Sequence, residues 1–266
     1  MERWFVAAKR ADFKEIGEKF SVDPVIARLI RNRDVVGDEA IRKYLYGGLE
    51  DLGEPGLMKG TTEAAELLDR KIRESKKLRV IGDYDIDGVM SSYILKTGLE
   101  RLGAQADVRI PDRLADGYGL NERLVRQAYE DGIDTIVTCD NGIAAAEQVA
   151  VAKELGMSVI VTDHHEIPYE EDEDGNRRYI LPPADAVINP KQTDCPYRFK
   201  GLCGAGVAFQ FIRCLYRQKG IEEEAWDFLE FTAIATVGDV MDLQGENRIL
   251  VKEGLKRLRH TPNLGL

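Results

Sequence analysis

Residues 78–88 read Leu-Arg-Val-Ile-Gly-Asp-Tyr-Asp-Ile-Asp-Gly and join a short β-rich run to an acidic loop. The run at 78–81 is rich in aliphatic and β-branched residues, so it predicts a strand. Apolar residues then recur at helical spacing over 89–102, which predicts a helix. A strand, a polar loop and a helix in this order are typical of one unit of a parallel α/β sheet.

The same alternation continues as far as residue 188. Four more β-rich runs predict strands at 106–110, 135–138, 158–162 and 186–188. Amphipathic stretches between them predict helices, for example at 122–130 and 144–155, and later stretches predict helices near 205–219, 224–235 and 248–259. The expected fold class is therefore α/β, with a five-stranded parallel sheet flanked by helices.

The N-terminal part of the chain predicts a different organisation. Over residues 1–77 apolar side chains recur at helical spacing without β-rich runs, so we expect a helical region there and the α/β domain over 78–266. The stretch 169–179 is too polar for a core. We expect it to be a solvated surface loop, with a gating role as the alternative.

Composition limits the classes of function. The chain has 266 residues, 44% hydrophobic and 32% charged, and it has no apolar run as long as a membrane-spanning helix requires. We therefore expect a soluble, cytoplasmic globular protein. The four cysteines form no C-x-x-C pair, which disfavours a zinc ribbon. The formal charge of −10 excludes a protein that coats nucleic acid through its overall field, so any phosphate must be held locally.

Polar side chains follow three of the predicted strands, and the carboxyl ends of parallel strands meet at one edge of the sheet. Aspartates at 83, 85 and 87 follow the first strand, Asp140 the third, and Asp163-His164-His165 the fourth. Carboxylates this close repel one another unless cations neutralise them. Oxygen ligands suit Mg²⁺ or Mn²⁺, and an imidazole ligand favours Mn²⁺. The sequence therefore predicts a metal site there, and Arg109 and Arg113 after the second strand are candidate phosphate ligands.

Three rival motifs fail. Asp83 to Gly88 matches the opening of an EF-hand loop, but the twelfth position is Ile94 instead of Glu. The chain contains no G-x-x-x-x-G-K-[ST] phosphate loop. The segment Gly204-Ala205-Gly206 is followed by Phe209 where a dinucleotide-binding fingerprint needs its third glycine. Because that segment opens a predicted helix, Gly204 and Gly206 are still candidates for binding a phosphate through backbone N–H groups.

The acidic motifs resemble those of the DHH phosphoesterase family, and within it the RecJ single-stranded-DNA exonucleases. Residues 83–88, 140–142 and 163–165 are similar to the first three motifs, and Asp239 in Thr-Val-Gly-Asp-Val is similar to the fourth. Further RecJ-like blocks cover nearly the whole chain. The chain departs from some family members in having Ile81 where they have histidine. It also ends before the DHH-associated domain and oligonucleotide-binding fold expected of RecJ proteins.

The resemblance implies roles for individual residues. Asp83 and Asp85 would hold one cation, Asp87, His164 and Asp239 a second, and Asp140 would bridge them. The two ions would be Mn²⁺, or Mg²⁺. His165 would contact the phosphoryl group or assist proton transfer, so we regard it and Asp140 as catalytic. Arg248 joins Arg109 and Arg113 as a candidate phosphate ligand, because guanidinium pairs with phosphate oxygens.

The implied activity is hydrolysis of single-stranded DNA from the 5′ end, in DNA repair and recombination. A single-strand-binding protein or a helicase would be a partner through regions absent from this chain, and no membrane partner is expected. One alternative is a DHH phosphodiesterase that acts on short oligonucleotides or cyclic dinucleotides. The other is a non-catalytic module that binds DNA or a protein, which the complete set of acidic residues disfavours.

Overall fold

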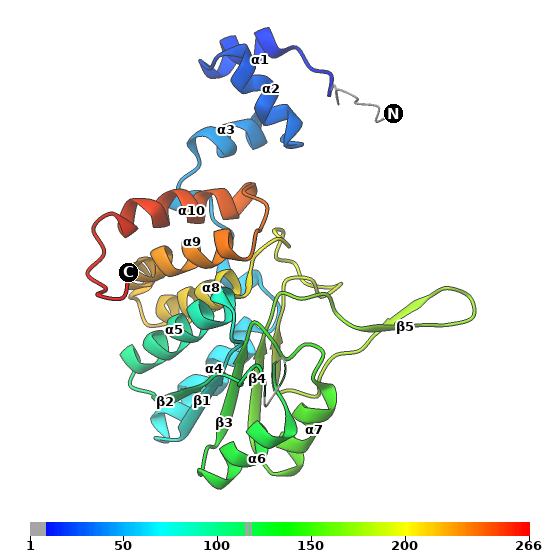
Figure 1. Cartoon of the computed structure of the whole chain (residues 1–266), viewed down its shortest axis with the longest axis vertical. Helices are drawn as coiled ribbons and strands as arrows, with labels where there is room; N and C mark the ends of the chain where they lie inside the picture. Colours follow the sequence, from blue (N-terminus) through cyan, green and yellow to red (C-terminus); the bar gives the residue numbers. More distant parts are fainter. Residues whose placement is uncertain (1–8, 115–116, 118) are drawn as a thin grey trace.

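The computed structural model describes residues 9–114, 117 and 119–266, and its centre is a five-stranded sheet (Figure 1). The strand order is β2-β1-β3-β4-β7 and every neighbouring pair is parallel. The strands are β1 (Lys77–Ile81), β2 (Gln105–Arg109), β3 (Thr135–Cys139), β4 (Ser158–Thr162) and β7 (Ala186–Ile188). All five predicted strands are confirmed, each within one residue at either end.

Helices cover both faces of the sheet. On one face α4 (Thr61–Arg73), α5 (Ile86–Arg101) and α8 (Gly204–Gln218) pack on Leu78, Val80 and Val137. On the other face α6 (Glu122–Glu130) and α7 (Ala146–Glu154) pack on Ile81 and Ile136. Alternate residues of each strand point to opposite faces, and in β3 and β4 both sets are buried, as a doubly covered parallel sheet requires, whereas the edge strand β2 is only partly covered.

The predicted helices are confirmed, with shifted ends. Helix α5 begins three residues earlier than predicted, because Asp85 caps it by accepting a hydrogen bond from the Gly88 N–H at 2.9 Å. The stretch predicted at 224–235 divides into a 3₁₀ helix, η3 (Glu222–Phe228), and α9 (Leu229–Gly238). Helix α10 (Gly245–Leu258) completes the layer beyond α8. None of these helices has the length and apolar character to cross a membrane.

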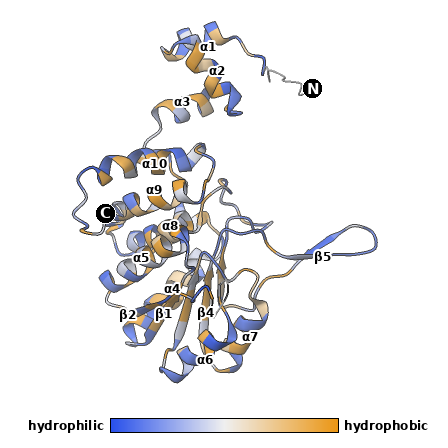
Figure 2. Ribbon diagram, in the orientation of Figure 1, coloured by the Kyte–Doolittle hydropathy of each residue, from blue (hydrophilic) through white to orange (hydrophobic). Residues whose placement is uncertain are grey.

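The polar segment 169–179 forms a hairpin instead of an irregular loop. Its strands β5 (Tyr169–Glu171) and β6 (Arg177–Tyr179) pair in antiparallel register and every residue in them is exposed. Cross-strand pairs hold it: Glu170 with Arg178 at 2.5 Å, and the rings of Tyr169 and Tyr179, whose centroids are 5.8 Å apart. The hairpin projects from the body and is largely hydrophilic (Figure 2), so the prediction of a solvated segment is confirmed and that of a loop is wrong.

The helices before the sheet fall into two groups. Helices α1 (Phe13–Phe20), α2 (Pro24–Asn32) and α3 (Asp38–Tyr46) build a small core of their own around Ile30, Val35 and Ile41. The 3₁₀ helices η1 (Leu49–Asp51) and η2 (Pro55–Leu57) then lead to α4, whose Leu67 and Leu68 belong to the main core. Of the region 1–77 that we expected to be helical, residues 1–8 lie outside the described residues, the described part before β1 is helical, and its last helix packs with the sheet.

A buried polar network joins α8, α10 and the segment before α8. The Tyr197 hydroxyl donates to Glu246 Oε2 at 2.6 Å, and Gln210 Nε2 donates to the same oxygen at 3.1 Å. Glu246 is 8% exposed. Burial raises the pKa of Glu246 above its ordinary value of 4.5, although the hydrogen bond from Tyr197 acts in the opposite direction. Ionised Glu246 therefore costs the folded protein free energy.

We expect Glu246→Gln to gain stability relative to the wild type as the pH rises. A carboxyl whose pKa is raised by folding stabilises the protein fully below its unfolded pKa, and this contribution is lost as the pH rises through the folded pKa. Glutamine does not ionise, so the free energy of unfolding of the variant lacks this decrease with pH. Urea denaturation of both proteins at pH 4.5 and pH 7 measures the difference in free energy of unfolding. A difference that stays constant, or that moves against the variant at pH 7, would contradict the assignment.

Candidate metal centre

The loop between β1 and α5 carries three aspartates to the carboxyl edge of the sheet. Asp83 is 1% exposed and follows the end of β1, whereas Asp85 is exposed as the cap of α5. Asp87 lies in the first turn of α5 and is 1% exposed. The change from strand to helix within this loop therefore points two buried carboxylates and one exposed carboxylate at the same edge.

The N-terminus of α8 holds the Asp87 carboxylate. The Gly204 N–H donates to Oδ2 of Asp87 at 2.6 Å and the Ala205 N–H donates to Oδ1 at 2.7 Å. The Gly204 N–H is thus used inside the protein, so the prediction that Gly204 binds a substrate phosphate is corrected, whereas the one for Gly206 stays a prediction. Gly204 has a different reason to be glycine, since a Cβ there would lie 2.7 Å from Cβ of Asp140.

Asp140 follows β3 in a left-handed backbone conformation, with φ of +59°. Outside glycine this conformation is uncommon, with asparagine, aspartate and histidine its most frequent occupants, and such residues cluster at functional sites. The next residue, Asn141, is buried and donates from Nδ2 to the carbonyls of Ile81 at 3.1 Å and Cys139 at 2.9 Å. Asn141 therefore ties together the strand ends that carry Asp83 and Asp140. The sequence analysis assigned no such role to Asn141, because the contact with Ile81 joins residues 60 positions apart and depends on the pairing of β1 with β3.

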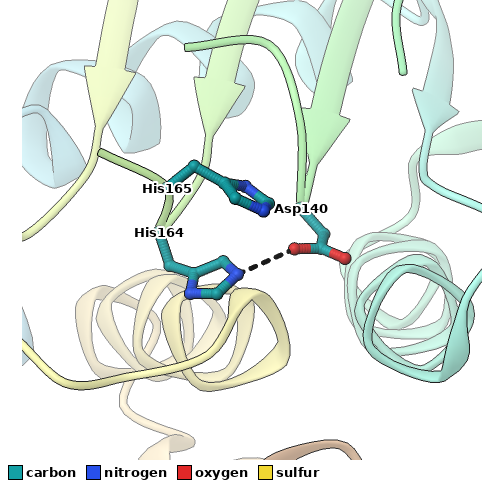
Figure 3. A group of neighbouring side chains, drawn as sticks. All are labelled: Asp140, His164 and His165. Atoms are coloured by element: carbon teal, nitrogen blue, oxygen red, sulfur yellow. Dashed lines mark ion pairs between the residues drawn. The ribbon is translucent and has the colours of Figure 1, made fainter. Parts of the chain in front are cut away.

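Two histidines reach the same edge from the end of β4, and both lie beside Asp140 (Figure 3). His164 is 7% exposed, and its Nε2 lies 3.1 Å from Oδ1 of Asp140. The same nitrogen lies 3.6 Å from Oδ2 of Asp87 and 3.9 Å from Oδ2 of Asp239. His164 is therefore the point at which carboxylates from three separate parts of the chain converge.

Asp163 orients the second histidine. Its Oδ1 accepts the backbone N–H groups of His164 and His165, at 2.7 and 3.1 Å, and lies 2.7 Å from Nδ1 of His165. Its Oδ2 accepts the Ile143 N–H at 2.9 Å. The hydrogen bond with Asp163 raises the pKa of His165, which favours its protonated form. The sequence placed Asp163 in a motif but did not reveal this positioning role.

Asp239 completes the site from the end of α9, where it is the residue that terminates the helix. The predicted ligands form two three-residue groups whose ligand atoms all lie within 4.8 Å of one another: Asp83, Asp85 and Asp140, and Asp87, His164 and Asp239. A third such group consists of Asp140, His164 and His165. The structure thus brings together every residue that we predicted as a metal ligand.

Burial makes the negative charge of this site costly. Burial, and then the carboxylates of Asp87 and Asp85, raise the pKa of Asp140 to about 11. Burial also raises the pKa of Asp83 and of Asp239, and it lowers the pKa of His164. Without a cation, the site favours protonated carboxyls and a neutral imidazole.

The donor set fits divalent cations. Among the described residues, Asp83 Oδ1 is a buried oxygen without a hydrogen-bond partner, which is unusual for a carboxylate. Carboxylate oxygens together with one imidazole nitrogen suit Mn²⁺, and the carboxylates alone suit Mg²⁺. Two groups of three ligands that meet at His164 and Asp140 could hold two ions side by side.

The predicted phosphate ligands lie in different places. Arg109 is exposed at the end of β2 and Arg113 lies over the ring of Tyr84, 5.5 Å from its centroid, so both are at the edge of the sheet that carries the aspartates. Arg248 lies between α10 and α3. Its Nε donates to the Tyr44 carbonyl at 2.5 Å, and its guanidinium lies over the Tyr44 ring. The prediction for Arg248 is corrected, because this side chain joins α10 to α3.

Known proteins share both the sequence and the fold. The chain is 40% identical over 265 residues to the single-stranded-DNA-specific exonuclease RecJ of Bacillus subtilis, covering 99% of this chain and 32% of that protein. It is 34% identical to RecJ of Haemophilus influenzae, covering 92% of this chain and 42% of the relative. The chain therefore spans between about a third and two fifths of the length of these relatives.

Solved structures of RecJ proteins are similar to this chain in fold. The structure of RecJ in complex with Mn²⁺ from Thermus thermophilus matches with a TM-score of 0.74 and 31% identity, over 94% of this chain and 34% of that chain. A structure of exonuclease RecJ bound to manganese matches with a TM-score of 0.66 and 37% identity, over 76% of this chain and 49% of that chain. The model of the DHH family, N-terminal domain, matches residues 77–236, which include β1 and most of α9. The chain thus belongs to the DHH family.

Proposed function

We propose that the chain is the catalytic part of a metal-dependent phosphodiesterase that degrades single-stranded DNA from its 5′ end. The observation that carries this proposal is the convergence of two three-ligand groups at one edge of the sheet. The names of the RecJ relatives support the substrate, and the RecJ structures with Mn²⁺ support the metal. The residues of the first proposed cation site are Asp83, Asp85 and Asp140. Those of the second are Asp87, His164 and Asp239, with Asp140 shared.

Two divalent cations held by these residues would supply an activated water for in-line attack on phosphorus and positive charge beside the leaving oxygen. The protein positions the substrate around them. His165, held by Asp163 and with its side chain 45% exposed, faces the open side of the site. Its raised pKa favours an imidazolium, which can donate a hydrogen bond to a phosphoryl oxygen. We therefore propose that His165 contacts the scissile phosphate.

DNA must be held by individual basic side chains near the site, because the net charge of −10 repels a polyanion at long range. Arg109 and Arg113 lie on the β2 side of the metal groups and are suited to the phosphates next to the scissile one. Arg113 also covers the Tyr84 ring, so the pair offers both charge and an aromatic surface. We propose that the protein acts in the cytoplasm, where a single-strand-binding protein or a helicase would present the DNA substrate to it.

We expect 5′-labelled single-stranded oligonucleotides to release short labelled products in the presence of Mn²⁺, whereas 3′-labelled ones of the same sequence release them only late. Duplexes of equal length should be resistant, and a chelator should stop the reaction. Gel analysis of 5-, 20- and 60-nucleotide substrates measures this. Rapid cleavage of the 5-mer with slow cleavage of the 60-mer would instead favour a phosphodiesterase for small substrates. Activity that persists in the chelator would refute the metal-dependent reaction.

A further inference from the structure

Two loops that the sequence separates widely support the second proposed cation site, and one side chain joins them. The segment before α8 leads to Gly204 and Ala205, whose N–H groups hold Asp87. The segment after α9 begins with Asp239. Asn247, in the first turn of α10, donates from Nδ2 to the Gly201 carbonyl at 2.7 Å and to the Asp242 carbonyl at 3.1 Å.

Each of these two acceptors lies close in sequence to a residue of the second proposed cation site. Gly201 lies three residues before Gly204, and Asp242 lies three residues after Asp239. Asp87 and Asp239 both face Nε2 of His164, at 3.6 and 3.9 Å. We infer that Asn247 is a positioning residue that sets the spacing of Asp87 and Asp239, and hence the affinity of the second cation site. This inference rests on the proposed function.

The surroundings of Asn247 indicate that its two donors matter more than its packing. The side chain is 1% exposed, and its Oδ1 is among the buried atoms that have no hydrogen-bond partner in the described part of the chain. A buried acceptor without a hydrogen-bond partner, such as Oδ1 of Asn247, costs free energy. If the side chain only filled space, an apolar residue would therefore be more stable at this position. The donors must therefore offset this cost, because they are the only part of the amide that the described structure uses.

The neighbouring loop geometry explains why a donor is needed. Val240 adopts a left-handed conformation with φ of +56°, which is strained for a β-branched residue, and it is 87% exposed. The chain between Asp239 and α10 thus turns sharply with little packing. The Met241 N–H donates to the Thr236 carbonyl of α9 at 3.1 Å, and the Asn247 amide, together with the Phe199 ring that lies against Gly245, connects this turn to the segment before α8.

The test compares Mn²⁺ binding by the full chain and by Asn247→Asp, which has nearly the same shape but lacks both donors. Calorimetric and electron paramagnetic titration with Mn²⁺ alone should show two sites in the wild type. In Asn247→Asp one site should keep its affinity and the other should weaken about 10- to 100-fold, the range typical of groups that orient metal ligands. Asn247→Ala should show the same weakening of one Mn²⁺ site, and it replaces Asn247→Asp in the test if that variant does not fold.

Thr61→Val is the matched control. Thr61 is likewise fully buried and donates from its hydroxyl to the carbonyls of Met58, at 2.6 Å, and Pro55, at 3.2 Å, away from the metal groups. This variant should lose stability but bind two ions as the wild type does. If both Asn247 variants bind two ions with wild-type affinity, or lose both sites equally, the inference is wrong. If the wild type itself binds no Mn²⁺, the proposed function fails instead.

Discussion

Asp140→Asn is expected to lose metal-dependent nuclease activity while keeping its fold. Asp140 belongs to one three-ligand group and approaches His164, a member of the other, to 3.1 Å, so its carboxylate is placed to serve both proposed cations. An amide offers one neutral oxygen where the site needs a charged, two-oxygen ligand. Groups that only orient metal ligands are worth 10- to 100-fold, so we expect the loss of this ligand to reduce the rate at least about 100-fold.

Asparagine is the appropriate substitution because it keeps the backbone. The φ of Asp140 is +59°, a conformation that asparagine tolerates and that alanine adopts only with strain. Burial and the neighbouring carboxylates raise the pKa of Asp140, which disfavours its charged form in the metal-free protein, so a neutral amide is accommodated at this position. The variant should therefore melt close to the wild-type temperature in a chelator, although its initial rate on single-stranded DNA with Mn²⁺ falls.

Glu230→Gln provides the control for this result. Glu230 is 4% exposed and accepts a hydrogen bond from the Thr261 hydroxyl at 2.6 Å, so it is also a buried carboxylate, but it belongs to none of the metal groups. Its variant should keep the wild-type rate. Wild-type activity in Asp140→Asn would remove Asp140 from the cation sites, and equal losses in both variants would indicate a general effect of buried charge.

Local sequence patterns predicted the sheet because each strand is short, aliphatic and bounded by polar loops. The residues that form the metal groups could be found for the same reason: in a parallel sheet, whatever follows each strand arrives at one edge. Asp83, Asp140 and His164 all have this placement. For these residues, strand order mattered less than the direction that all five strands share.

Asp239 could not be placed in this way. It terminates α9, so no strand brings it to the edge, and the family resemblance alone identified it. The roles of Gly204 and Asn247 were also out of reach, because each depends on a contact between distant segments. Gly204 hydrogen-bonds a residue 117 positions away. The helix N-terminus looked like a phosphate site, and it does bind an anion, but the anion is the protein's own carboxylate.

The hairpin at 169–179 shows a different limit. Its strands are three residues long and rich in charge, so neither period nor propensity predicts them. They form because the charges on opposite strands are complementary, with Glu171 near Arg177 and Glu170 near Arg178. Which charges face each other depends on the register of the two strands, and the turn sets this register. The number of charged residues in the segment does not reveal the register.

Mn²⁺ is expected to stabilise the protein, and a chelator to reverse this. The metal groups bring buried carboxyl groups together only in the folded protein, so a cation that binds them stabilises the folded state. A ligand at 100 times its dissociation constant adds about 2.7 kcal/mol to the free energy of unfolding. For a domain of this size that corresponds to a rise of about 5–10 °C in melting temperature. Thermal denaturation with and without Mn²⁺ measures it.

The variants make this expectation specific to the site. Asp140→Asn removes a ligand of the first group that also lies 3.1 Å from His164 of the second, so most of the rise should disappear, whereas Glu230→Gln should retain all of it. Ca²⁺ at the same concentration should raise the melting temperature less, because it prefers more oxygen ligands at longer distances and imidazole suits it poorly. If Mn²⁺ raised the melting temperature of Asp140→Asn as much as that of the wild type, the ion would be binding elsewhere. The acidic groups at the carboxyl edge of the sheet would then need another explanation for their burial.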